Sequence, residues 1–367
     1  MSIVWWLLVA GVVYPYLVYP VCLVVLSLFR RAVVAESGVS GPVTIVCAVH
    51  NEEAVIAEKI RNFYALEGEP RLLLGLDGCT DGTERIVRES VRDGRVIWYE
   101  FDRIGKSKVI NALMRKVDTP YVVMTDANSM CRPDAVKKLL GRFRSDVGVV
   151  CGRLMLVDAT GKSGEGFYWR FETWLKRLES PWGMVMGTNG AIYAFRRELF
   201  SDLPSYAIND DFMLSMKILE RGWSVVYAPD AVALERVATT DAAEFQRHVR
   251  DGAGHVGAMA YLVGMLNPLY WKRFFFYTSH RVMRWLTPLL LVLMVPVSWI
   301  AGGWLRNVFW VQCAGYALSA MVIASGIRWK PLYVPAYFVM VNAALLVGYV
   351  RAVFGMQRTT WASTARE

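Results

Sequence analysis

Two polar residues, Asp126 and Asn128, directly follow the apolar run from Tyr121 to Met124. Such a run of apolar and β-branched residues predicts a buried strand. A carboxylate at the end of a buried strand needs a cation, a hydrogen-bond donor or solvent. An Asp and an Asn two residues apart suit a hard divalent cation that itself holds a phosphate. The alternative is an ordinary Asx turn after the strand, which these residues favour when taken alone.

Polar residues also follow two earlier apolar runs. Asn51 and Glu52 come after the run 43–49, and Asp77 comes directly after the run 71–76. In open α/β sheets, ligands collect outside the carboxyl ends of the strands, so these side chains are candidates for one common site. Helix capping explains the turn after Asp77, but it does not explain Asp77 itself.

A basic turn adds positive charge to this set. Arg103, Lys106 and Lys108 surround Gly105. Carboxylates that hold a cation, together with lysine or arginine, describe a site for a metal-bridged diphosphate. The sequence has neither a P-loop motif nor a Rossmann fingerprint, which excludes those two modes of nucleotide binding.

The polar middle of the chain, residues 42–235, alternates predicted strands with predicted helices. This alternation indicates an α/β domain with a mostly parallel, Rossmann-like sheet. A last strand is expected to reach Pro229. The other predicted strands are 43–49, 71–76, 96–99 and 121–124, and the predicted helices are 52–66, 83–91 and 108–114.

The first segment, 1–31, is expected to be a transmembrane helix with a basic flank. The chain has 367 residues, of which 55% are hydrophobic, and a mean hydropathy of +0.31. Ile3 to Phe29 is long enough to cross a bilayer, and it lacks the basic start and cleavage site of a signal peptide. Arg30 and Arg31 follow it, which predicts a cytoplasmic side for this end by the positive-inside rule.

The end of the chain contains further apolar segments. About three transmembrane helices are expected in 286–356, preceded by an amphipathic interfacial region, 236–285, and followed by a tail, 357–367. Four crossings in all would leave the C-terminus outside. Arginines at Arg351, Arg358 and Arg366 disfavour that side, so the number of spans stays open.

Charge and cysteine content narrow the class of protein. The net charge of +9 fits a cytoplasmic membrane face with its lipids, or an anionic substrate. Nucleic acid is not expected as a partner, because the sequence has no binding motif or dense basic tract. The six cysteines have no paired spacing, which indicates reduced thiols.

Together, these motifs resemble the family 2 glycosyltransferases with the GT-A fold. The resemblance is to the membrane-anchored branch of cellulose, chitin, hyaluronan and poly-N-acetylglucosamine synthases, and it covers roughly residues 42–285. The similar segments are Ala48–Glu53, Leu76–Thr83, Gly105–Lys106 with Asn111, Thr125–Asn128 at the D-x-D position, and Asn209–Asp211 at the T-E-D position.

The resemblance implies a binding site for a nucleotide sugar and a metal cofactor. Asp126, with Asn128, would hold Mg²⁺ or Mn²⁺. Asn128 replaces the usual second Asp, and an amide oxygen without charge predicts weaker metal binding. The residues implied to bind the nucleotide sugar are Asn51, Glu52, Asp77, Lys106, Asp126 and Arg250.

The resemblance also implies the catalytic residues. Asp211 would be the general base that deprotonates the acceptor hydroxyl, since inverting transfer needs a carboxylate behind the anomeric carbon. Asp210 is the second candidate. Capping of the helix that begins near Phe212 is the alternative for one of the two, and the adjacent charges should raise one pKa.

Acceptor-side residues are implied by two further segments. Trp169 lies in an aromatic and basic stretch that would shape the acceptor site or pack against the membrane. Processive relatives carry Q-x-x-R-W where this chain has Arg247 in place of Gln, Arg250, and Asp251 in place of Trp. The missing Trp weakens the case for a long polymer threaded through the protein.

These observations predict an inverting glycosyltransferase in the bacterial inner membrane, with a cytoplasmic catalytic domain. It would move a sugar from a nucleotide donor, expected to be UDP-linked, to a lipid-linked or glycan acceptor. One alternative is a processive polysaccharide synthase that exports its polymer. Another is an inactive partner of a synthase complex, which the intact Asp77, Asp126 and Asp211 disfavour. A transporter is disfavoured because the apolar segments carry almost no charge.

Overall fold

The computed structural model describes residues 1–29, 38–39, 41–157, 167–236 and 240–356. The described residues form two compact units, one from 1–25 and 240–356 and the other within 26–236. The basic flank Arg30–Arg31 and the tail 357–367 lie outside the described residues.

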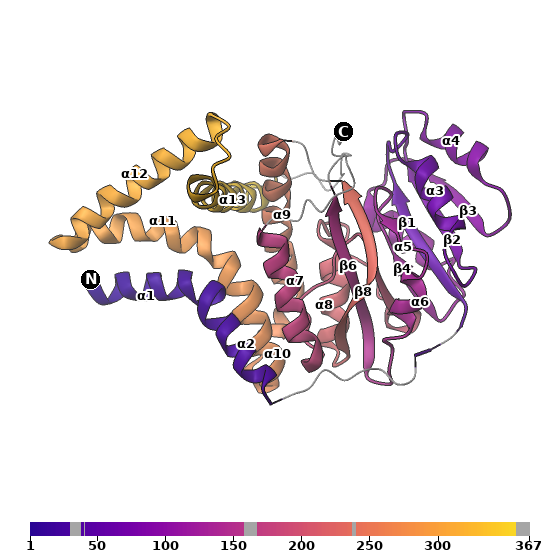
Figure 1. Ribbon diagram of the computed structural model, residues 1–367, viewed down its shortest axis with the longest axis horizontal. Helices are drawn as coiled ribbons and strands as arrows, with labels where there is room; N and C mark the ends of the chain where they lie inside the picture. Colours follow the sequence, from indigo (N-terminus) through magenta and orange to yellow (C-terminus); the bar gives the residue numbers. More distant parts are fainter. Residues whose placement is uncertain (30–37, 40, 158–166, 237–239, 357–367) are drawn as a thin grey trace. The chain divides into compact units, whose positions relative to one another are not determined.

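The unit formed by residues 26–239 is built on one sheet, shown in Figure 1. Among the described residues, eight strands follow the order β3-β2-β1-β4-β7-β6-β8-β5. The strands are β1 (Val43–Val49), β2 (Arg71–Asp77), β3 (Val96–Phe101), β4 (Tyr121–Met124), β5 (Met130–Cys131), β6 (Val147–Val157), β7 (Tyr193–Arg196) and β8 (Ser224–Arg236).

The sheet has a parallel half and a mixed half. β3, β2, β1 and β4 are parallel to one another, as the alternation of strands and helices predicts. β7 runs antiparallel to both β4 and β6, while β8 is parallel to β6 and antiparallel to β5. The last expected strand is longer than predicted, because β8 continues past Pro229 to Arg236.

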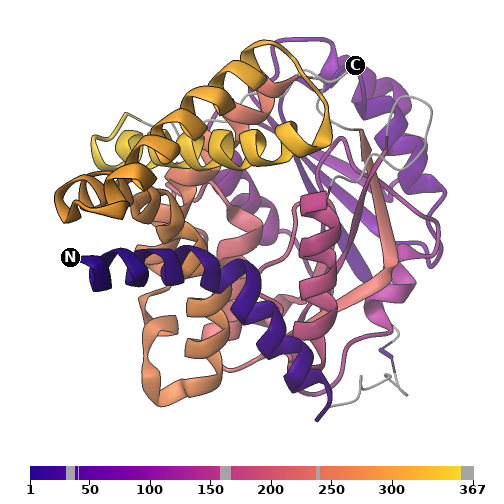
Figure 2. The same ribbon diagram turned by 60° about the vertical axis from the view of Figure 1, so that its left-hand side comes forward.

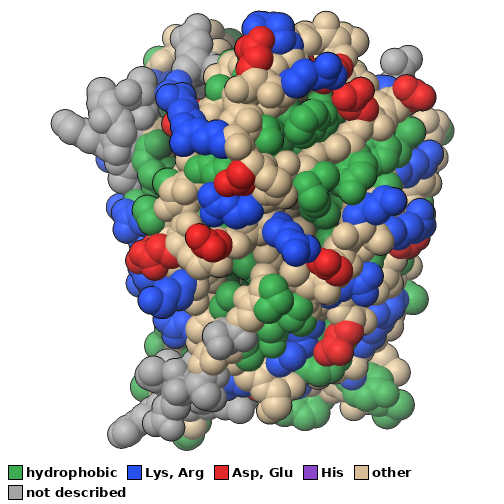
Figure 3. All heavy atoms as spheres, turned by 90° about the vertical axis from the view of Figure 1, so that its right-hand side faces the viewer, with side chains coloured by type: hydrophobic (Ala, Val, Ile, Leu, Met, Phe, Trp, Pro, Cys, Tyr) green, Lys and Arg blue, Asp and Glu red, His purple; other side chains and the backbone are tan. Residues whose placement is uncertain are grey.

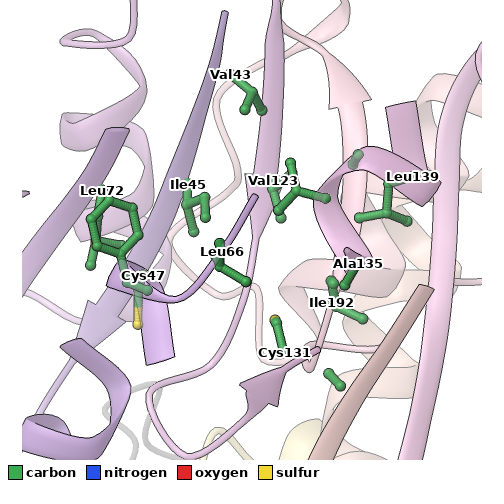
Figure 4. Close-up of a cluster of buried hydrophobic side chains, with 14 of the residues drawn as sticks. Val43, Ile45, Cys47, Leu66, Leu72, Val123, Cys131, Ala135, Leu139 and Ile192 are labelled. Carbon is green, nitrogen blue, oxygen red and sulfur yellow. The ribbon is translucent and has the colours of Figure 1, made fainter. Parts of the chain in front are cut away.

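Apolar side chains from several strands form the core of this unit. All seven residues of β1 are buried, which explains the continuous apolar run there. Figure 4 shows Ile45, Leu72 and Val123 of the sheet together with Leu139 of α6 in this cluster. The helices are α3 (Ile56–Tyr64), α4 (Thr83–Ser90), α5 (Lys106–Met114), α6 (Ala135–Leu140), α7 (Phe167–Glu179) and α8 (Asp210–Glu220).

The face that Figure 3 shows carries charges of both signs side by side. On α4, Arg88 pairs with Glu84 and Arg85 pairs with Glu89, each four residues apart. Exposed pairs of this kind add a few tenths of a kcal/mol to helix stability, about 0.3–0.5 each. These two pairs indicate that this face of α4 is exposed to solvent.

The other unit contains helices of membrane-spanning length. Four helical runs of the described residues are long and apolar enough to cross a membrane: Ser2–Ser27, Pro268–Ala301, Trp304–Ala324 and Lys330–Val353. Figures 1 and 2 both show α1 (Ser2–Val13) beside α11 (Met283–Ala301). The remaining helices are α2 (Tyr19–Ser27), α9 (Asp241–Tyr261), α10 (Trp271–Tyr277), α12 (Trp304–Ala324) and α13 (Lys330–Val353).

Two glycines allow α9 to pack directly against α13. A Cβ at Gly348 would lie 2.2 Å from the carbonyl oxygen of Val249, and one at Gly252 would lie 2.6 Å from that of Leu345. Small residues of this kind let helix backbones approach closely. α9, which carries Arg247 and Arg250, therefore packs closely against α13, one of the candidate membrane spans.

We expect Gly75→Ala to destabilise the sheet unit. Gly75 lies in β2 against α5, and a Cβ there would be 2.3 Å from Val109 Cγ1 and 3.0 Å from Leu113 Cδ1. Overpacking of a core typically costs about 1–3 kcal/mol. The control is Gly94→Ala, where a Cβ meets nothing within 4 Å. Thermal unfolding in detergent should show a lower midpoint for the first variant only, and equal midpoints would contradict this packing.

Candidate functional site

Three neighbouring strands bring the predicted residues to one edge of the sheet. β1 pairs in parallel with β2 on one side and β4 on the other, so their carboxyl ends point the same way. Asn51 follows β1, Asp77 ends β2, and Asp126 follows β4. This is the edge at which α/β proteins bind ligands.

The first two loops are tied together by side chains. Asn51 Oδ1 accepts a hydrogen bond from the Thr80 backbone N–H at 2.8 Å, and Asn51 Nδ2 donates to Thr80 Oγ1 at 3.0 Å. The backbone N–H of Glu52 donates to Thr83 Oγ1 at 2.8 Å. Asn51 also has a positive φ of 51°, which few residues other than glycine adopt. The loops after β1 and β2 therefore form one connected surface.

Asp77 is fully buried and holds the basic turn in place. Its carboxylate accepts hydrogen bonds from Arg103 Nη1 at 2.9 Å and from the Gly105 backbone N–H at 3.0 Å. Gly105 has a φ of 94°, which suits glycine. Asp77 thus sets the position of α5 and of its first residue, Lys106. Its contact with a nucleotide stays a prediction.

Lys106 joins two carboxylates that are far apart in the sequence. Its Nζ lies 3.0 Å from Asp126 Oδ1 and 3.1 Å from Asp210 Oδ1. Burial acts to lower the pKa of Lys106, but the charges of Asp126 and Asp210 outweigh it and raise that pKa. The lysine therefore stays charged and links the loop after β4 to the start of α8.

The backbone of 187–191 approaches Asp126 closely. A Cβ at Gly190 would lie 2.4 Å from Asp126 Oδ2, so only glycine leaves room for this carboxylate. Thr125 Oγ1 donates to the Ala191 carbonyl at 2.7 Å and ties the same segment to the loop. The sequence pattern did not reveal this role of Gly190.

Asn128 contacts a carboxylate that the sequence analysis missed. Its Nδ2 donates to Glu235 Oε1 at 3.2 Å, and Ser129 Oγ donates to Glu235 Oε2 at 3.4 Å. Glu235 lies near the end of β8, beyond the predicted end of that strand. No short motif marks it.

Lys59 is a second residue that the sequence analysis missed. It lies on α3 and is 3% exposed. Its Nζ donates to Thr125 Oγ1 at 2.8 Å and to the Ser129 carbonyl at 2.5 Å. A buried ammonium must be hydrogen-bonded, and here both ends of the loop 125–129 supply the acceptors. A lysine among the apolar positions of a predicted helix was the available signal.

The two adjacent aspartates of α8 have different surroundings. Asp210 is buried and pairs with Lys106, as described above. Burial, and then the charge of Asp210, raise the pKa of Asp211 to about 7. The N-cap residue of α8 is Asn209, which makes no side-chain capping bond. Asp210 therefore forms an ion pair with Lys106. Asp211 is the carboxylate of the two whose raised pKa allows proton exchange near neutral pH.

The remaining predicted residues have contacts of their own. Trp169 is on α7, where its ring contacts that of Tyr168 with centroids 6.1 Å apart. Arg247 and Arg250 are on α9, which belongs to the unit with the candidate spans. Arg247 donates to Glu244 Oε2 at 2.6 Å. Their roles at the acceptor and the donor stay predictions.

The oxygen atoms near Asp126 fit a divalent cation shared with a substrate. Among the described residues, no group of three or more His, Cys, Asp or Glu side chains could hold a metal ion. The Asp126 carboxylate and the Asn128 amide provide two oxygen donors on one loop, and the missing side chain at Gly190 makes room for the carboxylate itself. Such a partial set is typical of cations whose other ligands are substrate phosphates.

Comparison with known proteins assigns the family. Residues 41–254 match the family described as "Glycosyltransferase like family 2", which is more than half of the chain. The protein therefore belongs to this family.

Two curated relatives are enzymes of polysaccharide or glycolipid synthesis by name. The poly-β-1,6-N-acetyl-D-glucosamine synthase of Staphylococcus aureus is 23% identical over 222 residues, 58% of this chain and 54% of the relative. The β-monoglucosyldiacylglycerol synthase of Nostoc sp. is 24% identical over 229 residues, 56% of this chain and 47% of the relative. The chain thus spans about half the length of these relatives.

A solved structure has a similar fold over nearly the whole chain. It is a mannosyltransferase from Pyrobaculum calidifontis in complex with GDP-Man and Mn²⁺, with a TM-score of 0.72 and 19% identity. The match covers 96% of this chain and 99% of that chain. The expected GT-A fold with flanking helices of membrane-spanning length is confirmed.

We expect the transfer rate to fall as the pH drops below about 7. A general base must be unprotonated, and a pKa of about 7 means that Asp211 gains its proton as the pH falls through that value. Asp211→Asn should keep donor binding and lose transfer by on the order of 10²-fold or more, because the amide cannot accept the proton. Donor Kd and kcat measured across pH would test both.

Asp202→Asn is a matched control, because Asp202 is exposed and pairs only with Arg115 among the contacts described. Its pH profile should equal that of the unaltered protein. Normal turnover by Asp211→Asn would remove Asp211 as the base and leave Asp210 as the next candidate.

Proposed function

We propose that the protein is an inverting glycosyltransferase that uses a nucleoside diphosphate sugar and works in a membrane. The observation that carries this proposal is the Lys106 ammonium between Asp126 and Asp210 at the carboxyl edge of the sheet. That arrangement supplies a cation for a diphosphate, a carboxylate for a metal, and an adjacent carboxylate for proton transfer. The family assignment supports transfer of a sugar as the reaction.

Different residues would bind the donor, hold the metal and accept the proton. Lys106 would bind the donor diphosphate, while the loops after β1 and β2 receive the nucleoside through Asn51, Glu52 and Asp77. A cation bound by Asp126 and Asn128 would neutralise charge on the leaving diphosphate. Asp211 would take the proton of the acceptor hydroxyl as that oxygen attacks the anomeric carbon from the opposite face.

The donor is proposed to be UDP-linked and the acceptor lipid-linked or a glycan. The name of the Staphylococcus aureus relative supports an N-acetylglucosamine polymer as one product, and that of the Nostoc relative supports a glycolipid. The fold match was solved with GDP-Man, so guanine nucleotides belong in any donor screen. Asp251, in place of the Trp of processive relatives, supports addition of one or few sugars over polymer export.

The membrane location is proposed from the four candidate spans. We place the protein in the bacterial inner membrane with residues 42–235 as a cytoplasmic catalytic domain, 236–285 at the interface, and 286–356 as spans. The arginines after the first span support this orientation.

Donor turnover should require a divalent cation and Asp126. Purified protein incubated with UDP- and GDP-sugars and Mn²⁺ should release nucleotide with one of them. Excess EDTA should abolish release, and Asp126→Ala should have the same effect because it removes a charged ligand. Asp118→Ala is a matched control, since Asp118 is exposed and pairs with Arg71. Full activity in excess EDTA would refute the metal requirement. No release of nucleotide with any donor would refute the proposed glycosyltransferase activity.

A reporter fused after Arg31 should give a cytoplasmic signal, because two arginines follow the first span. A second fusion after Gly303 follows one more candidate span, so it should report the opposite side. An extracytoplasmic signal after Arg31 would contradict a cytoplasmic donor site. Equal signals from both fusions would show that Pro268–Ala301 does not cross.

A further inference from the structure

α13 is one of the four candidate spans, and it packs along the charged helix α9. Near the start of both helices, Tyr333 Oη donates a hydrogen bond to Asp241 Oδ1 at 2.9 Å. Further along, Gly348 is so close to α9 that a Cβ there would lie 2.2 Å from the Val249 carbonyl oxygen. The helix between Tyr333 and Gly348 is about 22 Å long, at a rise of about 1.5 Å per residue.

The stretch of α9 beside α13 carries charged residues of both signs, namely Glu244, Arg247, Arg250 and Asp251. The hydrocarbon core of a bilayer is about 30 Å thick, so a crossing α13 would hold this charged stretch beside it through most of the core. Charged side chains inside the core are costly. The contact between the two helices therefore costs less when both lie at the membrane surface.

Basic residues stand at both ends of α13. Arg328 and Lys330 lie at its start, and Arg351 lies in its last turn. Arg328 Nη1 pairs with Asp241 Oδ1 at 2.9 Å, which ties the start of α13 to α9. A crossing helix would leave one of these basic ends outside, whereas the positive-inside rule favours the cytoplasm for both.

α13 also differs in direction from the other candidate spans of its unit. Figure 1 shows α13 nearly end-on, whereas α1, α11 and α12 are seen from the side. All four helices belong to one compact unit. If α1, α11 and α12 cross the bilayer, α13 runs across their direction and lies closer to the membrane plane.

An exposed apolar stripe on α13 indicates what this helix contacts. Ala343, Val347, Val350 and Phe354 are exposed and are spaced as one side of a helix. We propose that α13 lies along the cytoplasmic surface of the bilayer, with this stripe among the lipid acyl chains and α9 packed on a different side. The inference rests on the proposed membrane location and refines it, because only the other three of the four candidate spans then cross.

The first test measures the depth of α13 in proteoliposomes of the full chain. A fluorescent non-natural amino acid at Ala343 or Val350 is quenched by lipids brominated at known depths, and both labels should give the same shallow depth. A crossing helix would separate these depths by about 10 Å. The matched control is α12, where Ala314 and Met321 are exposed, equally spaced, and expected to differ by about that amount. An equally large difference within α13 would overturn the proposal.

The second test determines the side on which each end of α13 lies, with epitope tags in the full chain in spheroplasts. Tags inserted after Gly326 and added after Glu367 should bind antibody only once the membrane is permeabilised, whereas a tag after Gly303 should bind without that step. Antibody access to the tag after Glu367 in intact spheroplasts, with the tag after Gly326 protected, would overturn the proposal.

Recovery of the protein in the soluble fraction would instead refute the membrane location on which the proposal rests. Neither measurement depends on sugar transfer, so both separate the placement of α13 from the proposed activity.

Discussion

The ion pairs of Lys106 are the interaction on which the rest of the site depends. The lysine is largely buried and touches carboxylates that come from the end of β4 and the start of α8. Asp210 is buried and the other two groups are partly exposed, so removal of the lysine would leave a buried carboxylate uncompensated. This constraint fixes how α8 meets the sheet, and it places Asp211 beside the cluster.

The sequence alone was enough to predict the part of the site that lies at the ends of the parallel strands β1, β2 and β4. β1, β2 and β4 are continuous apolar runs because the sheet buries them on both faces. Such runs are visible without homologues, and the polar residue after each run marks the carboxyl edge. Asn51, Asp77 and Asp126 could therefore be grouped before the fold was known. Their family roles came from the resemblance and not from the pattern.

The other half of the site depends on contacts that local sequence does not encode. β8 was expected to end at Pro229, but the register of its pairing with β6 shifts between Gly152 and Arg153, and the irregularity accommodates the proline. The strand then continues to Glu235. β5, which positions this residue, has only two residues and no periodic signal. Lys59 was missed although it lies among the apolar positions of a predicted helix. Gly190 was missed because only its tertiary contact with Asp126 marks it.

The adjacent aspartates of α8 illustrate how one short motif can supply two functions. Asp210 pairs with Lys106, which also faces Asp126, so it lies on the side of the site that is proposed to bind the diphosphate. Asp211 has no such cation within hydrogen-bond distance among the described contacts, and burial beside Asp210 raises its pKa to about 7. Environments that separate the behaviour of two carboxylates assign them different tasks. The same Asp210 that pairs with Lys106 therefore also raises the pKa of Asp211, the proposed general base.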